Sequence, residues 1–413
     1  MTSYSLLFAS WQRRMAAAAV TACLLGSTPP VLAQASAAAP AAPAATVAPQ
    51  TVTYASELST VPVPNVAARA WISLDVNSGQ IISAQDPDTQ VEPASLTKVM
   101  TAYLTFKALH EKRLTLDQQV PVSEHAWRTG GSRMFIEPLK PVTVGELIQG
   151  VIVQSGNDAS VALAEAIAGS EPAFAAMMNE EAKRLGMNNT HFVNATGLPD
   201  PTHLTTVRDL ATLASHIAAD FPDHYRYYQQ REYTYNNITQ PNRNRLLWLD
   251  PTVDGMKTGH TDAAGYCLIA SAVRGDRRIV TVVVGTTSET VRAQESLKLL
   301  NWSFQNFDTV KLYDANQAAI EARVWKGEIE QAALGSSSPV WVTVPRGQAP
   351  QIKPVAQRTD PLIAPLEQGQ QVGTLQLQLG DKIVQQMPLT VLQPVAEASF
   401  FGRLIDAARL QFQ

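Results

Sequence analysis

The sequence predicts an α+β domain followed by a small all-β domain, on the basis of how strand and helix patterns are ordered along the chain. One hairpin pattern lies near residues 70–86 and a second near 266–284, with helical periodicity between them. Strands from both ends of a segment that join one antiparallel sheet around a helical insert are typical of α+β folds. Beyond about residue 308, alternating runs amid proline and glycine predict strands alone.

The elements follow in order along the α+β segment. The hairpin at 70–86 turns at Asn77-Ser78-Gly79, and Thr143 with Glu146 forms a capping box that opens a helix. The hairpin near 266–284 turns at Gly275-Asp276. Apolar residues at helical spacing predict the remaining helices at 96–109, 158–168, 171–185 and 288–307.

The composition is that of an ordinary globular protein. The chain has 413 residues, of which 45% are hydrophobic and 16% charged, and its net charge is −4. It is long enough for two or three domains and too apolar for a disordered chain. A slightly acidic chain supplies no basic field for phosphates, so we expect no nucleic-acid partner. Two cysteines cannot form a disulfide scaffold or a zinc cluster.

The first 35 residues are typical of a secretory signal peptide. Arg13 and Arg14 precede an apolar run at 15–25, which is too short to span a bilayer, and small residues at 31–35 offer cleavage sites. A lipoprotein box ending at Cys23 is the weaker alternative, because the apolar run continues past that cysteine.

The prediction of export affects the rest of the chain. Residues 36–53, rich in alanine and proline, form a flexible or extended leader in this interpretation. Cys267 becomes the only thiol of the mature chain, and we expect it to be a buried strand residue rather than a reactive group.

The C-terminal part contains strand patterns and then one amphipathic helix. Trp341–Val344 and Leu375–Leu379 alternate apolar and polar residues, as strands of the small β-domain would. In 397–413 the apolar residues share one helical face: Phe400, Phe401, Leu404, Ile405, Ala408 and Phe412. Such a helix lies in a membrane interface or docks on its own domain, and periodicity alone favours neither.

The first candidate catalytic motif is Ser95-Leu96-Thr97-Lys98. Residues three apart lie on one helical face, so the Lys98 amine can reach the Ser95 hydroxyl. The hydroxyl needs a base to become a nucleophile, and a lysine acts as a base when burial or a nearby positive charge lowers its pKa. Ser-x-x-Lys occurs about once by chance in a chain this long, so the motif alone indicates only a helix surface.

Two further motifs lie downstream. Ser155-Gly156-Asn157 interrupts two apolar helical runs and can present a hydroxyl and an amide to a cleft, although a helix cap or turn is the simpler interpretation. Lys257-Thr258-Gly259, followed by His260, is expected at a strand edge that an extended peptide can join. Lys257 can attract a carboxylate and supply the charge that keeps Lys98 neutral.

In this order the three motifs are the signature of penicillin-binding proteins and class A β-lactamases. From about residue 54 to the C-terminus, the chain resembles the low-molecular-mass penicillin-binding proteins that act as serine-type D-alanyl-D-alanine carboxypeptidases. The similarity extends to Glu92–Lys98, Lys257–Tyr266 and Phe400–Leu404. It implies a transpeptidase/β-lactamase-like domain over 54–306, a β-rich domain over 307–394 and an amphipathic membrane anchor over 395–413.

The resemblance also implies a mechanism without metal or cofactor. Ser95 attacks the penultimate D-alanine carbonyl of a peptidoglycan pentapeptide, Lys98 is the general base, and the leaving D-alanine is protonated through Ser155 and Lys257. The catalytic set implied by the family is Ser95, Lys98, Ser155, Asn157 and Lys257. The substrate-binding set is Lys257, Thr258, Gly259, His260, Arg292 and Arg243.

Backbone N–H groups of Ser95 and His260 match the family's oxyanion hole, and β-lactams are expected to acylate Ser95. The implied location is the periplasm, at the outer face of the cytoplasmic membrane.

A class A β-lactamase would need a glutamate after its second motif, and residues 188–209 contain none, so slow release of penicillin is expected. A D,D-endopeptidase and a catalytically weak cell-wall scaffold remain open. A zinc peptidase is disfavoured, because no His-Glu-x-x-His pair is present.

Overall fold

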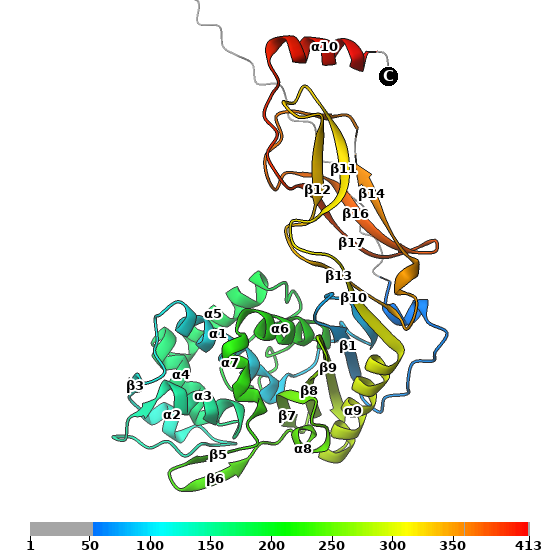
Figure 1. Ribbon diagram of the computed structural model, residues 1–413. Coiled ribbons are helices and arrows are strands. Elements are labelled where there is room, and N and C mark those ends of the chain that lie inside the picture. The colour runs from blue at the N-terminus through cyan, green and yellow to red at the C-terminus, as the bar shows by residue number, and fades with distance from the viewer. Residues whose placement is uncertain (1–52, 359, 412–413) are drawn as a thin grey trace, which may run out of the picture. The chain divides into compact units, whose positions relative to one another are not determined.

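The structure, a computed structural model, describes residues 53–358 and 360–411 (Figure 1). The predicted signal peptide, nearly all of the Ala/Pro-rich leader and Phe412 lie outside the described residues. The α+β architecture predicted for the first part of the chain and the all-β architecture predicted for the second are both confirmed.

A five-stranded antiparallel sheet forms the centre of the first part, in the order β2-β1-β9-β8-β7. The strands are β1 (Ala70–Asp75), β2 (Ile81–Gln85), β7 (Val253–Thr261), β8 (Gly265–Arg274) and β9 (Arg277–Thr286). Both predicted hairpins are present, since β1 pairs with β2 and β8 with β9. The Lys257 motif lies in β7, at one edge of the sheet.

Successive strand residues point to opposite sides of the sheet, and each side is covered by a hydrophobic core, so both faces are buried. On β8, Leu268 packs in a core with Leu299 and Leu300 of α9 (Glu289–Asn306). The neighbouring Ile269 packs in a second core on the other face, which includes Leu210 of α6 (Val207–Asp220). Ser288 caps α9 by accepting a hydrogen bond from the Val291 N–H.

The helical block inserted between the strands has the predicted helices and their caps. It contains α1 (Lys98–His110), α2 (Glu124–Arg128), α3 (Val144–Ile152), α4 (Asn157–Ala168), α5 (Glu171–Arg184) and the short α7 (Pro222–Tyr225). The capping box of α3 is formed as predicted, with Thr143 and Glu146 each accepting from the other's backbone N–H. Short pairs β3–β4 (Gln119–Val120, Val142–Thr143) and β5–β6 (Glu232–Tyr235, Ile238–Pro241), and α8 (Leu246–Leu249), complete this part.

Strands alone form the body of the second part. A two-stranded pair joins β10 (Phe307–Tyr313) to β13 (Val340–Pro345). A six-stranded sheet has the order β14-β16-β17-β12-β11-β15. Its strands are β11 (Ala318–Trp325), β12 (Gln331–Gly335), β14 (Ile352–Arg358), β15 (Leu362–Ile363), β16 (Gln371–Leu379) and β17 (Lys382–Val391).

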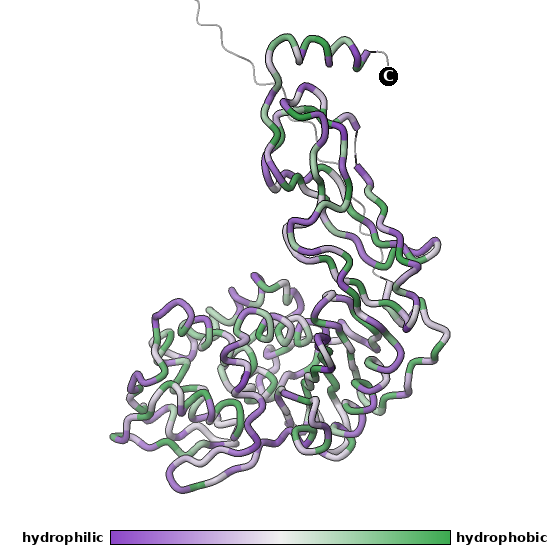
Figure 2. The backbone as a smooth tube through the Cα atoms, in the orientation of Figure 1, coloured by the Kyte–Doolittle hydropathy of each residue, from purple (hydrophilic) through white to green (hydrophobic). Residues whose placement is uncertain are grey.

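The last element is α10 (Phe400–Leu410), at the C-terminal end of the chain (Figure 1), and hydrophobic and hydrophilic residues alternate along it (Figure 2). The exposed apolar side chains are Phe400, Phe401, Leu404 and Ile405, at 53–75% exposure. The polar side is held on the β-domain, where Asp406 accepts a hydrogen bond from the Lys326 backbone N–H at 2.7 Å. Among the described helices none is alone long and apolar enough to cross a membrane, and only the bent pair α4–α5 passes that test jointly.

Candidate active site

The Ser95 motif forms the junction of two helices. The 3₁₀ helix η2 (Ala94–Thr97) runs directly into α1, so Lys98 lies on the turn above Ser95 as the spacing predicted. The Lys98 Nζ is 2.9 Å from the Ser95 Oγ. Ala94, just before the serine, has a φ of +47°, a left-handed conformation that non-glycine residues rarely adopt and that tends to occur at functional sites. The hydroxyl and the amine are therefore in direct contact.

A backbone carbonyl from a distant segment holds the other side of the Lys98 amine. The Thr196 carbonyl accepts a hydrogen bond from Nζ at 2.5 Å. The Asn194 Oδ1 fixes this turn by accepting from the N–H groups of Thr196 and Gly197. Gly197 has a φ of +81°, and a Cβ there would lie 1.8 Å from the Ala94 carbonyl oxygen. Glycine is therefore needed for this turn to pack against Ala94, beside Ser95.

The environment of Lys98 makes its amine a base near neutral pH. The side chain is 1% exposed, and burial, assisted by the positive charge of Arg243, lowers its pKa to about 7, against an opposing effect from Asp158. Burial disfavours the ammonium form because the charge loses its hydration. The sequence predicted burial or a nearby positive charge as the cause of the lowered pKa and offered Lys257 as the source of the charge; in the structure burial is the main cause and the charge is that of Arg243.

The Ser155 motif lies between α3 and α4. Ser155 is buried with a φ of +60°, and its Oγ is 2.9 Å from the Lys257 Nζ. Asn157 is the first residue of α4, and its Nδ2 donates to the Gly130 carbonyl at 2.7 Å. Gly156 is the N-cap of α4, so the motif is a helix cap as the simpler interpretation predicted. The same cap also presents the Ser155 hydroxyl to Lys257, as the site interpretation predicted.

Asp158 supports the start of α4 beside Asn157, and no motif in the sequence singled it out. Its fully buried carboxylate accepts the N–H groups of Met134, Phe135 and Ile136 at 2.8–3.2 Å. The segment before α3 is thereby fastened to the start of α4, beside Asn157. An acidic residue in the first turn of a helix looks from sequence like an ordinary N-terminal partner of the helix dipole.

The Lys257 motif brings the sheet edge close to η2, which carries Ser95. A Cβ on Gly259 would lie 3.1 Å from the Pro93 carbonyl oxygen and 3.3 Å from the Ala94 Cβ, so β7 runs close to η2. Lys257 and Thr258 are buried, whereas His260 is exposed and its ring lies 4.0 Å from that of Tyr266. Burial lowers the pKa of Lys257 well below its ordinary value, with repulsion from Lys98 and two arginines adding to the effect.

The two candidate arginines lie together beside β7. Arg292 of α9 is 3% exposed, donates to the Gly259 carbonyl at 3.5 Å and to the Arg243 carbonyl at 3.5 Å, and burial lowers its pKa. Arg243, in the loop before α8, is exposed. Its flanking residues Asn242 and Asn244 are buried and hydrogen-bonded, which anchors the loop that carries this guanidinium.

The structure thus gathers the predicted residues from five separate segments. Two Ser–Lys pairs, Ser95 with Lys98 and Ser155 with Lys257, stand against one sheet edge with two arginines near its end. A serine hydroxyl bonded to a buried amine that is neutral near pH 7 is the arrangement of a nucleophile with its base. Fold and site define a serine acyl-transfer enzyme.

Comparison with known proteins identifies the family. Residues 57–288 match the Peptidase S11 family, described as D-alanyl-D-alanine carboxypeptidase, and residues 307–397 match the C-terminal domain of penicillin-binding protein 5. The chain belongs to this family of serine D-alanyl-D-alanine carboxypeptidases. It is 44% identical to D-alanyl-D-alanine carboxypeptidase DacC of Escherichia coli K12 over 87% of this chain and 92% of that protein. Against DacA of the same strain the identity is 40%, over 85% and 89%.

Solved structures agree with the fold. Penicillin-binding protein 5 from Haemophilus influenzae superposes with a TM-score of 0.79 at 40% identity, covering 82% of this chain and all of that chain. Penicillin-binding protein D2 from Listeria monocytogenes in its ampicillin-bound form gives a TM-score of 0.55 at 29% identity, over 59% of this chain and all of that one. These relatives favour a carboxypeptidase over the endopeptidase and the scaffold.

Proposed function

We propose that this enzyme removes the terminal D-alanine from peptidoglycan pentapeptides outside the cytoplasmic membrane, through an acyl-enzyme on Ser95. The observation that carries the proposal is the 2.9 Å contact between the Ser95 Oγ and a Lys98 amine whose pKa is about 7. A base with a pKa near the working pH combines the correct protonation state with the strongest drive for proton transfer.

Acylation begins when the Lys98 amine takes the Ser95 proton and the Ser95 Oγ bonds to the penultimate D-alanine carbonyl carbon. The resulting oxyanion is stabilised by the backbone N–H groups of Ser95 and His260, each worth about 3–4 kcal/mol in comparable sites. The approach of β7 to η2 at Gly259 supports this assignment, because it brings the backbone at His260 beside the nucleophile.

Collapse of the tetrahedral intermediate requires a proton on the leaving nitrogen. The Ser155 hydroxyl supplies it and is re-protonated by Lys257, whose Nζ lies 2.9 Å away. The C–N bond breaks and D-alanine departs, which leaves Lys98 protonated and Lys257 neutral. Return of that proton from Lys98 to Lys257 restores both groups, and the neutral Lys98 amine then activates water to hydrolyse the Ser95 ester. Both Ser–Lys pairs are used, one for each face of the scissile amide.

Recognition of the substrate's terminal carboxylate falls to the basic end of the site. Lys257, Thr258, Arg292 and Arg243 are the residues we assign to it. Burial depresses the pKa of Lys257 in the free enzyme, and an arriving carboxylate favours the ammonium form. The substrate thus restores the charge on the lysine that must re-protonate Ser155.

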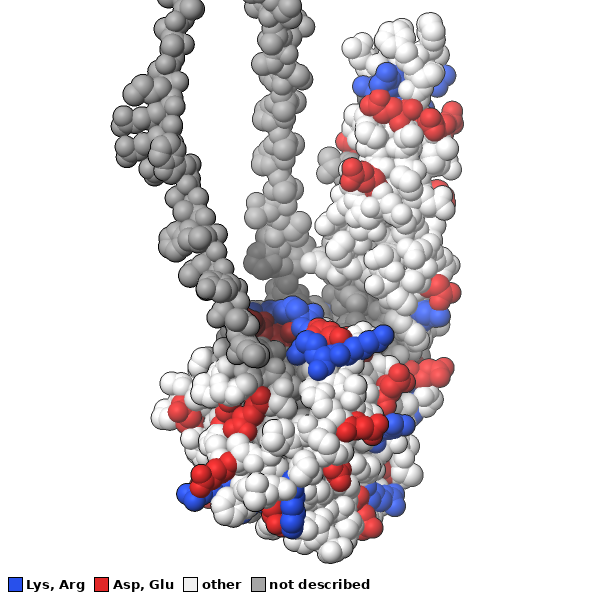
Figure 3. Space-filling model, turned by 90° about the vertical axis from the view of Figure 1, so that its left-hand side faces the viewer, with Lys and Arg blue, Asp and Glu red and all other residues white. Residues whose placement is uncertain are grey.

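We further propose that α10 attaches the enzyme to the membrane surface. A helix usually buries its apolar stripe, yet here the apolar side chains face outward and the polar side meets the β-domain. Figure 3 shows an uncharged end at α10 with charged side chains gathered next to it. An outward apolar face beside a charged band fits a helix lying in the membrane interface.

The catalytic proposal is tested by mass spectrometry after incubation with penicillin. Wild type should gain one penicillin mass and Ser95→Ala none, and only wild type should release D-alanine from a pentapeptide mimic. Cleavage of cross-linked dimers without D-alanine release would establish an endopeptidase instead. A penicillin adduct that persists in Ser95→Ala would place the nucleophile elsewhere.

A further inference from the structure

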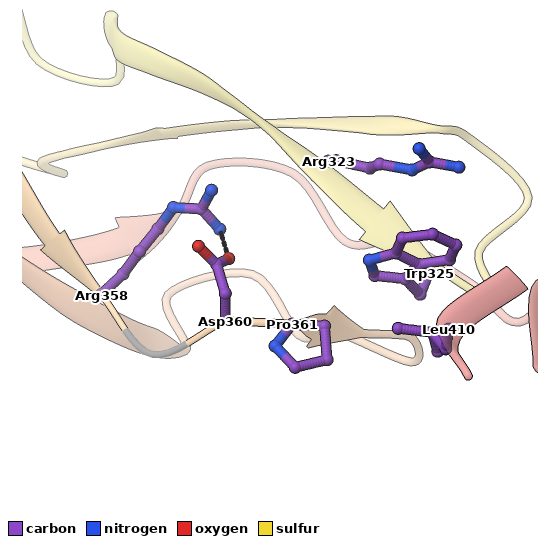
Figure 4. Close-up of a pocket in the computed structure, with 6 residues that line it drawn as sticks. All are labelled: Arg323, Trp325, Arg358, Asp360, Pro361 and Leu410. Carbon is purple, nitrogen blue, oxygen red and sulfur yellow. Dashed lines mark hydrogen bonds and ion pairs between the residues drawn. The ribbon is translucent and has the colours of Figure 1, made fainter. Parts of the chain in front are cut away.

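A cavity of about 430 Å³ lies at the C-terminal end of α10, within the β-domain (Figure 4). Its lining comes from β11, from the end of β14 and the residues after it, and from α10: Arg323, Trp325, Arg358, Asp360, Pro361 and Leu410. None of these residues takes part in the acyl-transfer site. The cavity is thus a separate feature, bounded on one side by the proposed membrane helix.

The charges of the cavity leave one guanidinium free. Arg358 forms an ion pair with Asp360, so these two charges compensate each other. The Arg323 guanidinium lies 3.9 Å from the centre of the Trp325 ring, and it makes no hydrogen bond or ion pair with any residue in 53–358 or 360–411. Trp325 is itself buried. A planar guanidinium held on a buried ring is preorganised for two parallel hydrogen bonds to a phosphate.

The position of the cavity beside α10 indicates that the phosphate belongs to a lipid headgroup. An interfacial helix sinks about 5–10 Å into the boundary between headgroups and acyl chains, and a helix with its side chains is about 10–12 Å across. With the apolar face of α10 inserted, the side that carries Asp406 and contacts the β-domain lies at the level of the lipid phosphates. Leu410, which lines the cavity, is on this partly buried side.

We propose that this cavity binds the phosphodiester of a phospholipid headgroup, with Arg323 as the main contact and Arg358 as the second. The inference rests on the proposed attachment of α10 to the membrane and adds a specific headgroup site to it. One negative charge matches the single uncompensated guanidinium, so phosphatidylglycerol is the appropriate probe.

The test measures binding of the full chain to vesicles of phosphatidylcholine with and without phosphatidylglycerol. Arg323→Gln should weaken binding to the phosphatidylglycerol vesicles about fivefold, the value of one cation near an anionic surface. Lys353→Gln is the matched control, because Lys353 is exposed on the same strand as Arg358 but five residues away, about 17 Å along the strand. This control should bind like wild type.

A second measurement separates the headgroup site from the anchor. Dihexanoyl phosphatidylglycerol, titrated at concentrations where it is monomeric, should bind wild type and not Arg323→Gln. Inorganic phosphate at the same concentration should not displace this lipid from wild type. Three results would overturn the headgroup site: Lys353→Gln loses as much binding as Arg323→Gln, Arg323→Gln loses no binding, or inorganic phosphate displaces the short-chain lipid. If wild type does not bind vesicles but binds the short-chain lipid through Arg323, membrane attachment by α10 is refuted and the headgroup site is supported. If wild type binds neither, both proposals are refuted.

Discussion

Replacing Lys98 with methionine should abolish acylation and yet stabilise the catalytic domain near neutral pH. Folding places this amine in a site where its pKa is about 7, whereas in the unfolded chain it has its ordinary value of 10.5. Between these values the unfolded chain binds one proton more than the native chain, so the free energy of unfolding rises with pH. Below pH 7 both states are protonated and the full cost of burial is present.

The magnitude follows from the difference in pKa. At 1.36 kcal/mol per unit, burying Lys98 costs about 5 kcal/mol below pH 7, about 3 kcal/mol at pH 8 and nothing above pH 10.5. Lys98→Met removes this cost but leaves the Thr196 carbonyl without its donor, which costs about 1–3 kcal/mol. The net stabilisation is therefore about 2 kcal/mol at pH 7 and declines by roughly 1 kcal/mol per pH unit above it. Loss of the repulsion between Lys98 and Lys257 acts in the same direction.

The assay is urea unfolding of wild type and Lys98→Met at pH 7 and pH 9, compared over the same transition. Lys183→Met is the control, because Lys183 is exposed on α5 and its replacement should leave the pH dependence unchanged. A difference between Lys98→Met and wild type that does not change with pH would show that the Lys98 amine is not held neutral by burial. The base assignment would then lose its physical basis.

Three further outcomes follow from the same geometry. The rate of penicillin acylation should fall about tenfold per pH unit below pH 7, as Lys98 becomes protonated, and a flat stopped-flow profile from pH 5 to 7 would contradict this. Arg292→Gln should lower kcat/KM for a carboxylate-bearing pentapeptide about 10- to 100-fold, and a substrate amidated at that carboxylate should show no such loss. Gly197→Ala places a Cβ against the Ala94 carbonyl, so acylation should slow about 100-fold while calorimetry still shows a folded domain.

Sequence patterns were sufficient where side chains and periodicity carry the signal. The capping box at Thr143, the two hairpins and the contact of Lys98 with Ser95 all follow from local spacing, and the structure has each of them. The burial of Cys267 in β8 follows equally from its apolar neighbours, and burial raises the pKa of its thiol to about 11.

Other parts of the site had no such signal. The acceptor for Lys98 is the main-chain carbonyl of Thr196, and every residue type offers the same carbonyl. The left-handed conformations of Ala94 and Ser155 depend on tertiary packing, since neither residue favours them locally. The β5–β6 hairpin and α6 were not predicted either; each strand of the hairpin is only four residues long, and β6 is exposed at three of its four positions, so it lacks the apolar alternation of a buried sheet.

The two Ser–Lys pairs have equal 2.9 Å contacts but different surroundings, and the surroundings decide which lysine is the base. Lys98 faces a neutral carbonyl, and with its pKa near 7 it is ready to accept a proton before substrate arrives. Lys257 lies near Arg292 and Arg243, so the carboxylate that these arginines attract also stabilises its ammonium form. In the proposed mechanism, binding of the correct substrate therefore creates the acid only after the base is in place, which couples recognition of a free C-terminus to release of D-alanine.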